Sequence, residues 1–387
     1  MEFHAADAIV LTNANVVVAD RVFPGWIAVD QGRVVEIGEG RGPKGEIDCQ
    51  GDYLLPGLVE LHTDHLEAHF MPRPRVFWHP GSAVMAYDAQ IAAAGITTVF
   101  DSFRVGTDEY EDWRSGAGEQ VVTLADAIER ARAADLLRAD HQTHLRCEIP
   151  SPNVVESFEE FLARHPARLV SLMDHTPGQR QFRDLDKYFI YYQGKTGQSE
   201  HELAEVVRER RRVGRERAEA NRPHIVAIAQ SRGLTLASHD DTTLEDVEEA
   251  KRDGVHIAEF PTTHEAAAAS RAAGMATVMG APNVVRGGSH SGNASARELA
   301  EAGLLDILSS DYVPAALLMA AFRLADAANA GGLAGAVRLV TKNPAEAAGL
   351  SDRGEIAVGR RADLVRVRGH YGEPVVRAVW REGQRIA

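Results

Sequence analysis

The 387-residue sequence is poor in cysteine and in positive charge, and it contains no long apolar run. Cys49 and Cys147 are too few for a disulfide framework. No run approaches the roughly 18 consecutive apolar residues of a membrane span. The first residues also lack the basic and apolar parts of a secretion signal. We therefore expect a cytoplasmic protein that does not associate with membranes.

The net charge of −14 argues against a protein that coats nucleic acid, because phosphate binding needs a positive field. A small anionic substrate is still compatible with this charge, provided that Arg, Lys and His gather locally. Aromatic residues are sparse and Gly and Ala plentiful, which favours tightly packed α/β layers. Homo-oligomer formation is also compatible with the sequence.

Two patterns of apolar and polar residues divide the chain into two expected domains. Residues 1–55 and 352–387 alternate apolar and polar residues between turns, which predicts one small β-sandwich domain formed by both termini. Residues 56–351 alternate short β-rich runs with helix-forming stretches, with the dimensions of a (β/α)8 TIM-like barrel. An open doubly wound sheet is the alternative, but no Gly-rich nucleotide loop follows the first strand. The eight expected strands are LVELHTD, ITTVFDS, THLRCEI, LVSLMDH, LTLASHD, VHIAEFP, ATVMGAP and DILSSDY.

Nearly every expected strand ends at a residue that can bind metal or move a proton. Strand residues two apart project on the same side, so His62 and Asp64 are expected to point into the barrel mouth. Imidazoles and carboxylates gathered there suit zinc or another borderline divalent ion. A lone strand histidine is more often a hydrogen-bonded core residue, and some of the aspartates can equally be loop caps or can orient the imidazoles. The strand-end groups are His62, Asp64, Glu148, Asp174, His175, His239, Asp240, Asp241, Glu259 and Asp311.

The order of these groups resembles the amidohydrolase superfamily, as do LLPGLVELHTD, NPAEAAGL, GEIAVGRRADLVRV and the split β domain. PRPR, DHTPGQRQF, YYQGKTG, LASHDDTT, EFPTT, MGAPNVVRGGSHSGN and LSSDYVP narrow the resemblance to the PhnM branch, from bacterial alkylphosphonate utilisation. That branch has Asp64 where the superfamily usually has a second histidine. His65, where the branch has Asn, and His79 depart from its pattern and concern substrate choice.

The resemblance implies a diphosphatase that cleaves the α–β phosphoanhydride of α-D-ribose 1-methylphosphonate 5-triphosphate and releases pyrophosphate. It implies a divalent metal cofactor, zinc foremost, with one or two ions. Asp311 is expected to act as general base and then acid, and Glu148 to bridge two ions. The implied metal residues are His62, Asp64, Glu148, His175, His239 and Asp311.

Candidate cations for a phosphorylated sugar follow the strands in loops. The prolines of PRPR stiffen one such loop, and glycines in the others let backbone N–H groups approach a phosphate. For any single arginine, a solvated surface charge is the alternative. Residues 200–222, rich in Arg and Glu, are expected to form a solvated helix face with charge pairs. The candidate substrate-binding residues are Arg73, Arg75, Arg180, Lys195, Arg286 and His290.

Two other functions stay open at this point. An amide hydrolase or deacetylase on the same scaffold would need fewer basic loop residues. The other is a metal-bound scaffold that binds partners without turnover, and the retention of the His, Glu and Asp strand ends argues against it.

Overall fold

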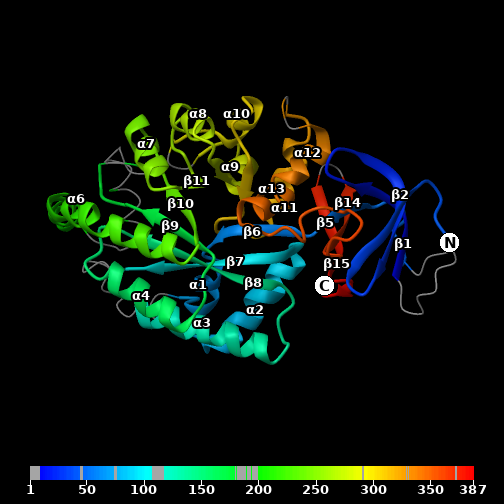
Figure 1. Cartoon of the computed structure of the whole chain (residues 1–387), viewed down its shortest axis with the longest axis horizontal. Helices are drawn as coiled ribbons and strands as arrows, with labels where there is room; N and C mark the ends of the chain where they lie inside the picture. Colours follow the sequence, from blue (N-terminus) through cyan, green and yellow to red (C-terminus); the bar gives the residue numbers. More distant parts are fainter. Residues whose placement is uncertain are drawn as a thin grey trace.

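The structure is a computed structural model that describes residues 9–43, 47–73, 76–106, 117–178, 180, 189, 193, 199–289, 292–327, 329, 331–370 and 373–387. Eight parallel strands among these residues form one sheet (Figure 1). Asp311 forms a parallel bridge with Thr63, which brings the last strand back to the first. Each expected strand overlaps one of these, so the barrel prediction is confirmed. The strands are β6 (Leu58–Thr63), β7 (Ile96–Val105), β8 (Asp140–Glu148), β9 (Leu169–Met173), β10 (Thr235–His239), β11 (Ile257–Glu259), β12 (Ala276–Gly280) and β13 (Ile307–Ser309).

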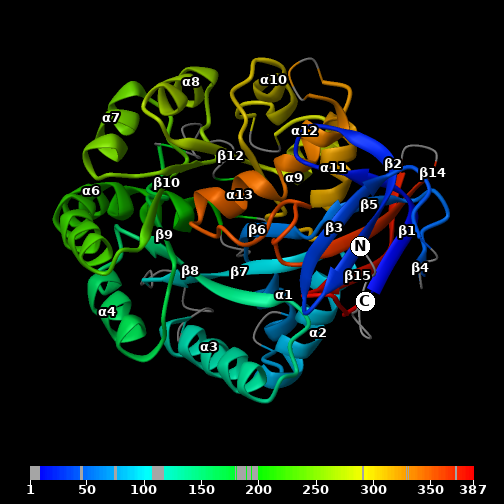
Figure 2. The same ribbon diagram turned by 45° about the vertical axis from the view of Figure 1, so that its right-hand side comes forward.

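Helices surround the barrel sheet (Figure 2). Thr243 and Thr263 cap two of them through their side chains, which accounts for two threonines in the loops after the strands. None of the helices in the described ranges combines the length and apolar character that crossing a membrane requires. The helices are α1 (His65–Phe70), α2 (Pro80–Ala93), α3 (Ala117–Ala133), α4 (Val154–Arg164), α6 (Glu200–Ser231), α7 (Leu244–Arg252), α8 (His264–Ala272), α9 (Ala281–Arg286), α10 (Ala296–Glu301), α11 (Ala316–Leu324), α12 (Gly332–Arg338) and α13 (Lys342–Ala347).

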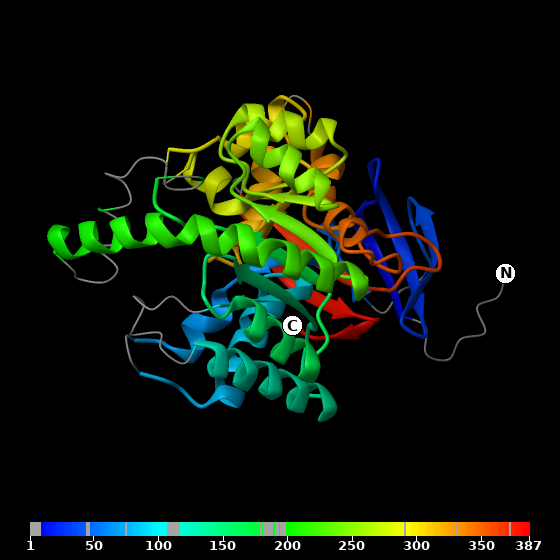
Figure 3. The ribbon, with the colours of Figure 1, turned by 60° about the vertical axis from the view of Figure 1, so that its left-hand side comes forward.

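The longest of these helices, α6, follows β9 and runs across one side of the barrel (Figure 3). Ser199 begins it with a capping box, in which Ser199 accepts from the Glu202 backbone and Glu202 accepts from the Ser199 backbone. Leu203, Val207 and Ile225 are buried along its inner side. The expected helix over residues 200–222 is therefore present, and part of it faces the barrel.

A second sheet is built from both ends of the chain. Its strand order is β16-β15-β14-β5-β1-β2-β3, with β4 paired to β1. β5 lies between β1 and β14, so it joins the two terminal segments. The sheet encloses its own apolar core, which includes Ile27, Leu54 and Trp380. Its strands are β1 (Ile9–Val17), β2 (Val22–Asp30), β3 (Arg33–Glu39), β4 (Ile47–Asp48), β5 (Tyr53–Pro56), β14 (Leu364–His370), β15 (Glu373–Arg381) and β16 (Gln384–Arg385).

Successive side chains of β8 point to opposite faces of the barrel sheet. Leu145 and Cys147 pack into the large apolar core between the sheet and the helices. His144, Arg146 and Glu148 lie on the opposite face of the strand, toward the barrel interior. One strand therefore supplies both apolar packing and three polar groups to the barrel interior.

Candidate metal centre and active site

The ends of β8 and β9 bring Glu148 and His175 together. Glu148 accepts a hydrogen bond from the His175 backbone N–H at 2.9 Å, and its Oε2 lies 2.6 Å from His175 Nδ1. Arg104 of β7 donates to the same oxygen at 3.4 Å. Burial raises the pKa of the Glu148 carboxyl, but His175 and Arg104 outweigh it and hold the pKa well below its usual range. Glu148 is thus a carboxylate that fixes the orientation of the His175 ring.

His239, at the end of β10, offers a nitrogen to this site. Its Nδ1 lies 2.8 Å from Asp240 Oδ2, while its buried Nε2 has no hydrogen-bond partner within the described ranges. His175, His239 and Asp240 each place one ligand atom within 4.8 Å of the others. Burial lowers the pKa of His239, but the Asp240 carboxylate outweighs it and the net shift is upward. An imidazole nitrogen without a partner, beside a second imidazole and a carboxylate, fits a divalent ion.

Asp311 lies at the barrel mouth, just after the last barrel strand, β13. Its backbone N–H donates to the His62 carbonyl at 3.2 Å, and its φ of 55° turns the chain at that point. Burial and the nearby Asp64 raise the pKa of the Asp311 carboxyl to about 7. Asp64 lies just past the strand, at the start of α1, and its carboxylate is 3.5 Å from Arg146 Nη1. Two carboxylates and one guanidinium therefore share this side of the mouth.

Beneath the mouth lies a second group of potential ligands, His62, His144 and Glu259. His62 Nδ1 lies 3.0 Å from Glu259 Oε1, and His144 Nδ1 donates to the Leu61 carbonyl at 2.8 Å. Ser171 Oγ connects the group, at 2.5 Å from both His144 Nε2 and Glu259 Oε2. Burial lowers the pKa of His144 to about 3 and holds that of His62 well below its usual value. The imidazoles of His62 and His144 are therefore neutral, and the contact with Glu259 holds the His62 ring in place.

Glu60 extends the lower layer toward β13. The carboxylate is fully buried and accepts from the His62 N–H at 2.7 Å, the Ser309 hydroxyl at 2.9 Å and the Ser310 N–H at 2.5 Å. Burial raises the pKa of Glu60 to about 7. Glu60 thereby ties the first barrel strand to the last.

The six expected metal residues all lie at carboxyl ends of barrel strands or directly after them. His62 and His175 each lie 5.5 Å from His239, measured between ring centroids, which places the three imidazoles together. Sequence reasoning missed Glu60, His144 and Arg146. The last two are four and two residues before Glu148 on one strand face, so alternation along β8 was the signal that could have found them.

The six cations expected to bind substrate differ in burial, and three of them lie outside the described residues. Arg180 is 8% exposed, and its guanidinium donates to Asp241 at 2.7 Å and to the His239 carbonyl at 3.1 Å. It ties the loop after β9 to the end of β10. Arg73 and Arg286 are exposed, whereas Arg75, Lys195 and His290 lie outside the described residues. A substrate role for these six stays a prediction.

Two histidines that depart from the PhnM pattern have local partners. His65 Nε2 lies 3.0 Å from Gln90 Oε1, which His69 Nε2 also approaches at 2.8 Å. His79 begins α2 and accepts from the Ser82 N–H at 3.4 Å. His65 therefore joins α1 to α2, and His79 caps the start of α2.

A barrel with imidazoles and carboxylates at its carboxyl rim, next to a sheet made from both termini, is the architecture of metal-dependent barrel hydrolases. The chain belongs to the amidohydrolase family, whose model matches residues 193–386. The α-D-ribose 1-methylphosphonate 5-triphosphate diphosphatase of Escherichia coli (strain K12) is 46% identical over 381 residues, which cover 97% of this chain and 100% of that protein. The resemblance to the superfamily and to its PhnM branch is thereby confirmed.

Two solved structures share the fold. The 5-methylcytosine deaminase of Klebsiella pneumoniae has a TM-score of 0.66 at 14% identity, covering 98% of this chain and 97% of that one. The N-acetyl-D-glucosamine-6-phosphate deacetylase of Mycobacterium smegmatis has a TM-score of 0.63 at 18% identity, covering 98% and 100%. Identities this low support the shared fold alone.

Proposed function

We propose that this protein is a hydrolase that cleaves the α–β phosphoanhydride of α-D-ribose 1-methylphosphonate 5-triphosphate. The products are pyrophosphate and ribose 1-methylphosphonate 5-phosphate, as in phosphonate catabolism. The observation that carries the proposal is the 46% identity to the E. coli diphosphatase over nearly the whole of both chains. The residues at the barrel mouth suit this reaction.

His175, His239 and Asp240 fit a divalent ion, for which we propose zinc. His62, Asp64, Glu148 and Asp311 complete the candidate set for one or two ions. When bound, such an ion lowers the pKa of a water molecule and offsets negative charge on phosphoryl oxygens.

Asp311 is the proposed general base. A carboxyl group whose pKa is about 7 can accept the proton of the attacking water and then return it near neutral pH. The hydrogen bond from its backbone to the His62 carbonyl fixes it at the mouth. Glu148 supports the reaction by holding the His175 ring through Nδ1, which leaves Nε2 directed at the site.

The remaining predictions belong to the same proposal. They are a small β domain of residues 1–55 plus 352–387, a barrel domain of residues 56–351, a small anionic phosphorylated sugar as substrate without a nucleic-acid or membrane partner, a cytoplasmic location and a possible homo-oligomer.

The test is pyrophosphate release by the purified protein loaded in turn with zinc, manganese and magnesium. We expect release from the ribose triphosphate with at least one of these metals. The same preparations are given N-acetyl-D-glucosamine 6-phosphate as an amide substrate. Deacetylation without any pyrophosphate release would replace the proposal with the amide hydrolase alternative, and the absence of both activities would favour the scaffold alternative.

A further inference from the structure

Arg180 carries a buried positive charge next to the candidate metal centre. Its side chain is 8% exposed, and the residue lies five positions after His175 in the segment that follows β9. Its Nη1 donates to the His239 carbonyl at 3.1 Å and to Asp241 Oδ1 at 2.7 Å. The guanidinium therefore joins the segment that carries one candidate ligand to the strand end that carries two others.

The carbonyl that Arg180 contacts belongs to the peptide between His239 and Asp240. The chain turns at this peptide, since Asp240 has a φ of 57°, and a residue in this left-handed region persists where its neighbours fix the backbone. Asp240 Oδ2 lies 2.8 Å from His239 Nδ1 and 3.8 Å from His175 Nε2. A rotation of the peptide would therefore displace the carboxylate and the His239 ring together.

Asp241 extends the contact to the residue before the turn. Its Oδ1 accepts from Arg180, and its Oδ2 accepts from the Ser238 hydroxyl. Ser238 and Asp241 flank the two candidate ligands along the chain. One guanidinium and one carboxylate thus fix the backbone on both sides of these ligands.

The second amino group of Arg180 faces the carboxylates of α7. Its Nη2 lies 3.4 Å from Asp246 Oδ1 and 3.6 Å from Glu249 Oε2. Asp246 Oδ2 accepts from the backbone N–H groups of Thr242 and Thr243, at 3.0 and 2.9 Å. Arg180 is therefore anchored through both amino groups, and the surrounding carboxylates offset its buried charge.

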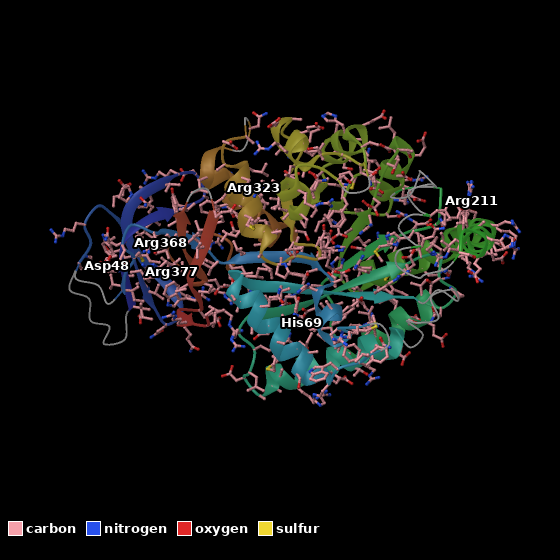
Figure 4. All side chains as sticks on the ribbon, turned by 180° about the vertical axis from the view of Figure 1, so that it is seen from behind. Asp48, His69, Arg211, Arg323, Arg368 and Arg377 are labelled. Carbon is pink, nitrogen blue, oxygen red and sulfur yellow. The ribbon has the colours of Figure 1, made fainter. Side chains whose placement is uncertain are left out.

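Two residues before Arg180, the chain turns beside α6. Gly178 has a φ of 91°, a conformation that glycine adopts without strain. A Cβ atom on Gly178 would lie 3.4 Å from Cζ of Arg211, which Figure 4 labels on α6 at the end of the molecule far from Asp48. The turn and the helix therefore lie close together.

Arg222 of α6 matches Arg180 in burial and shares one of its carboxylates. It is also 8% exposed, with Nη1 at 2.9 Å from Glu249 Oε2 and Nε at 2.6 Å from Asp253 Oδ2. Its ion pairs in the described part of the chain lie on α7 and directly after it, not on β10. Arg222 is thus a buried arginine of the same cluster that does not contact the peptide between the candidate ligands.

Burial separates Arg222 from the exposed arginines of its helix. Arg208 and Arg212 are 70% and 67% exposed, and they pair with Glu205 and Glu209 one turn earlier. Exposed pairs of this kind contribute little to stability. The prediction of a solvated face with charge pairs therefore holds for one side of α6 only.

We propose that Arg180 is a positioning residue that holds His239 and Asp240 in the arrangement that binds the metal ion. This inference rests on the proposed function for the metal ion, whereas the identity of the substrate does not enter it. Arg180 acts through the peptide between the two ligands and through Asp241. A phosphate contact, the role expected from the sequence, would instead make KM the quantity that depends on Arg180.

The experiment uses the full-length protein with zinc alone as the probe. Zinc affinity is measured by competition with a chelator of known affinity, and KM and kcat are measured with the ribose triphosphate at saturating zinc. In R180M we expect zinc affinity to fall by about 10- to 100-fold, because the peptide between the ligands loses its fixed donor. KM should change by less than about threefold, since no substrate contact is removed.

R180K tests whether charge alone is sufficient. Lysine keeps the charge but replaces the planar fork of donors with one ammonium group. We expect a loss of zinc affinity smaller than that of R180M, and R180K carries the comparison if R180M yields no folded protein. In that case, unaltered zinc affinity in R180K would overturn the proposal.

R222M is the matched control, because it removes a guanidinium of equal burial from the same cluster. Its melting temperature should fall about as much as that of R180M, since each substitution leaves buried carboxylates without their cation. Its zinc affinity should change by less than about twofold. Equal losses of zinc affinity in R180M and R222M would assign the effect to stability and overturn the proposal. A raised KM with unaltered zinc affinity in R180M would overturn it in favour of a phosphate contact.

Failure of this role and failure of the proposed function give different results. If the unaltered protein binds zinc but releases no pyrophosphate, the function is contradicted, and a loss of zinc affinity in R180M alone still supports the role of Arg180. If the unaltered protein is active and R180M binds zinc equally tightly, the role is contradicted and the function stands.

Discussion

Two layers of polar side chains cross the barrel, and they differ in how their atoms are used. In the lower layer, Glu60, His144 and Glu259 are bonded to neighbouring protein groups on the barrel strands. In the upper layer, His239 keeps a buried nitrogen without a described protein partner, and Asp311 is a carboxyl group with a pKa of about 7. A closed network stabilises a fold, whereas an open one can accept an ion or a proton. His144 and His239 are similarly buried, but only His239 has a ring nitrogen without a described partner.

The strongest test of the upper layer is Asp311→Asn. Since the amide cannot accept the water's proton, we expect kcat to fall by about a thousandfold. Metal content should stay nearly unchanged, because other strand ends supply ligands. The measurement is pyrophosphate release together with elemental analysis. Tyr312→Phe, an exposed neighbour, is the control, and a fully active Asp311→Asn protein would exclude the role as base.

A substitution in the lower layer should reduce the free energy of unfolding. His144→Ala removes the donor to the Leu61 carbonyl and the contact with Ser171, leaving buried polar groups without partners. We expect a loss of about 2 to 4 kcal/mol in the free energy of unfolding, measured by urea denaturation. His224→Ala, on the exposed side of α6, is the control. Unchanged stability would contradict the closed network.

Asp240→Asn tests the proposed metal site of the upper layer. The aspartate accepts from His239 Nδ1, which would leave Nε2 to hold a metal ion. We expect metal affinity to fall by about 10- to 100-fold while the folded structure persists. Competition with a chelator of known affinity measures this change. Asp246→Asn, at the start of α7, is a carboxylate control from the same loop region.

The smallest expected effect concerns pH. Asp311 must be ionised to act as a base, so activity should fall as the pH drops through its pKa of about 7. Arg146 lowers that pKa, so Arg146→Met should raise it and move the acidic limb of the kcat profile to higher pH, by about one unit or less. A limb that moves to lower pH would contradict the assigned coupling. Arg208→Met should leave the profile in place.

The fold and the strand-end groups were accessible from the sequence because both depend on short-range pattern. Each β-rich run ends within three residues of the end of a strand, and the sequence accordingly placed His175 and His239 at the carboxyl ends of β9 and β10. In the lower layer, His62 and Glu259 were also named from the sequence, whereas Glu60 was not. A buried Glu60 within a strand cannot be separated from a misassigned strand until its partners on other strands are known.

The arginines illustrate a second limit. Arg208 and Arg210 have similar sequence surroundings, and only the rotation of α6 against the barrel puts one in solvent and leaves the other half-buried. Arg180 follows a Pro-Gly turn, which favoured an exposed phosphate contact. Its carboxylate partners Asp241, Asp246 and Glu249 lie far along the chain, so their convergence is a tertiary effect.

The terminal sheet also constrains how the protein is made. β5 must pair with β14, where Leu364 lies opposite Pro56, so this sheet can be completed only after the ribosome has synthesised the entire barrel. Until then β5 exposes an unpaired edge directly before the first barrel strand, and such edges favour pairing with other chains. We therefore expect the nascent chain to be most prone to aggregation through this edge in the interval before β14 is synthesised.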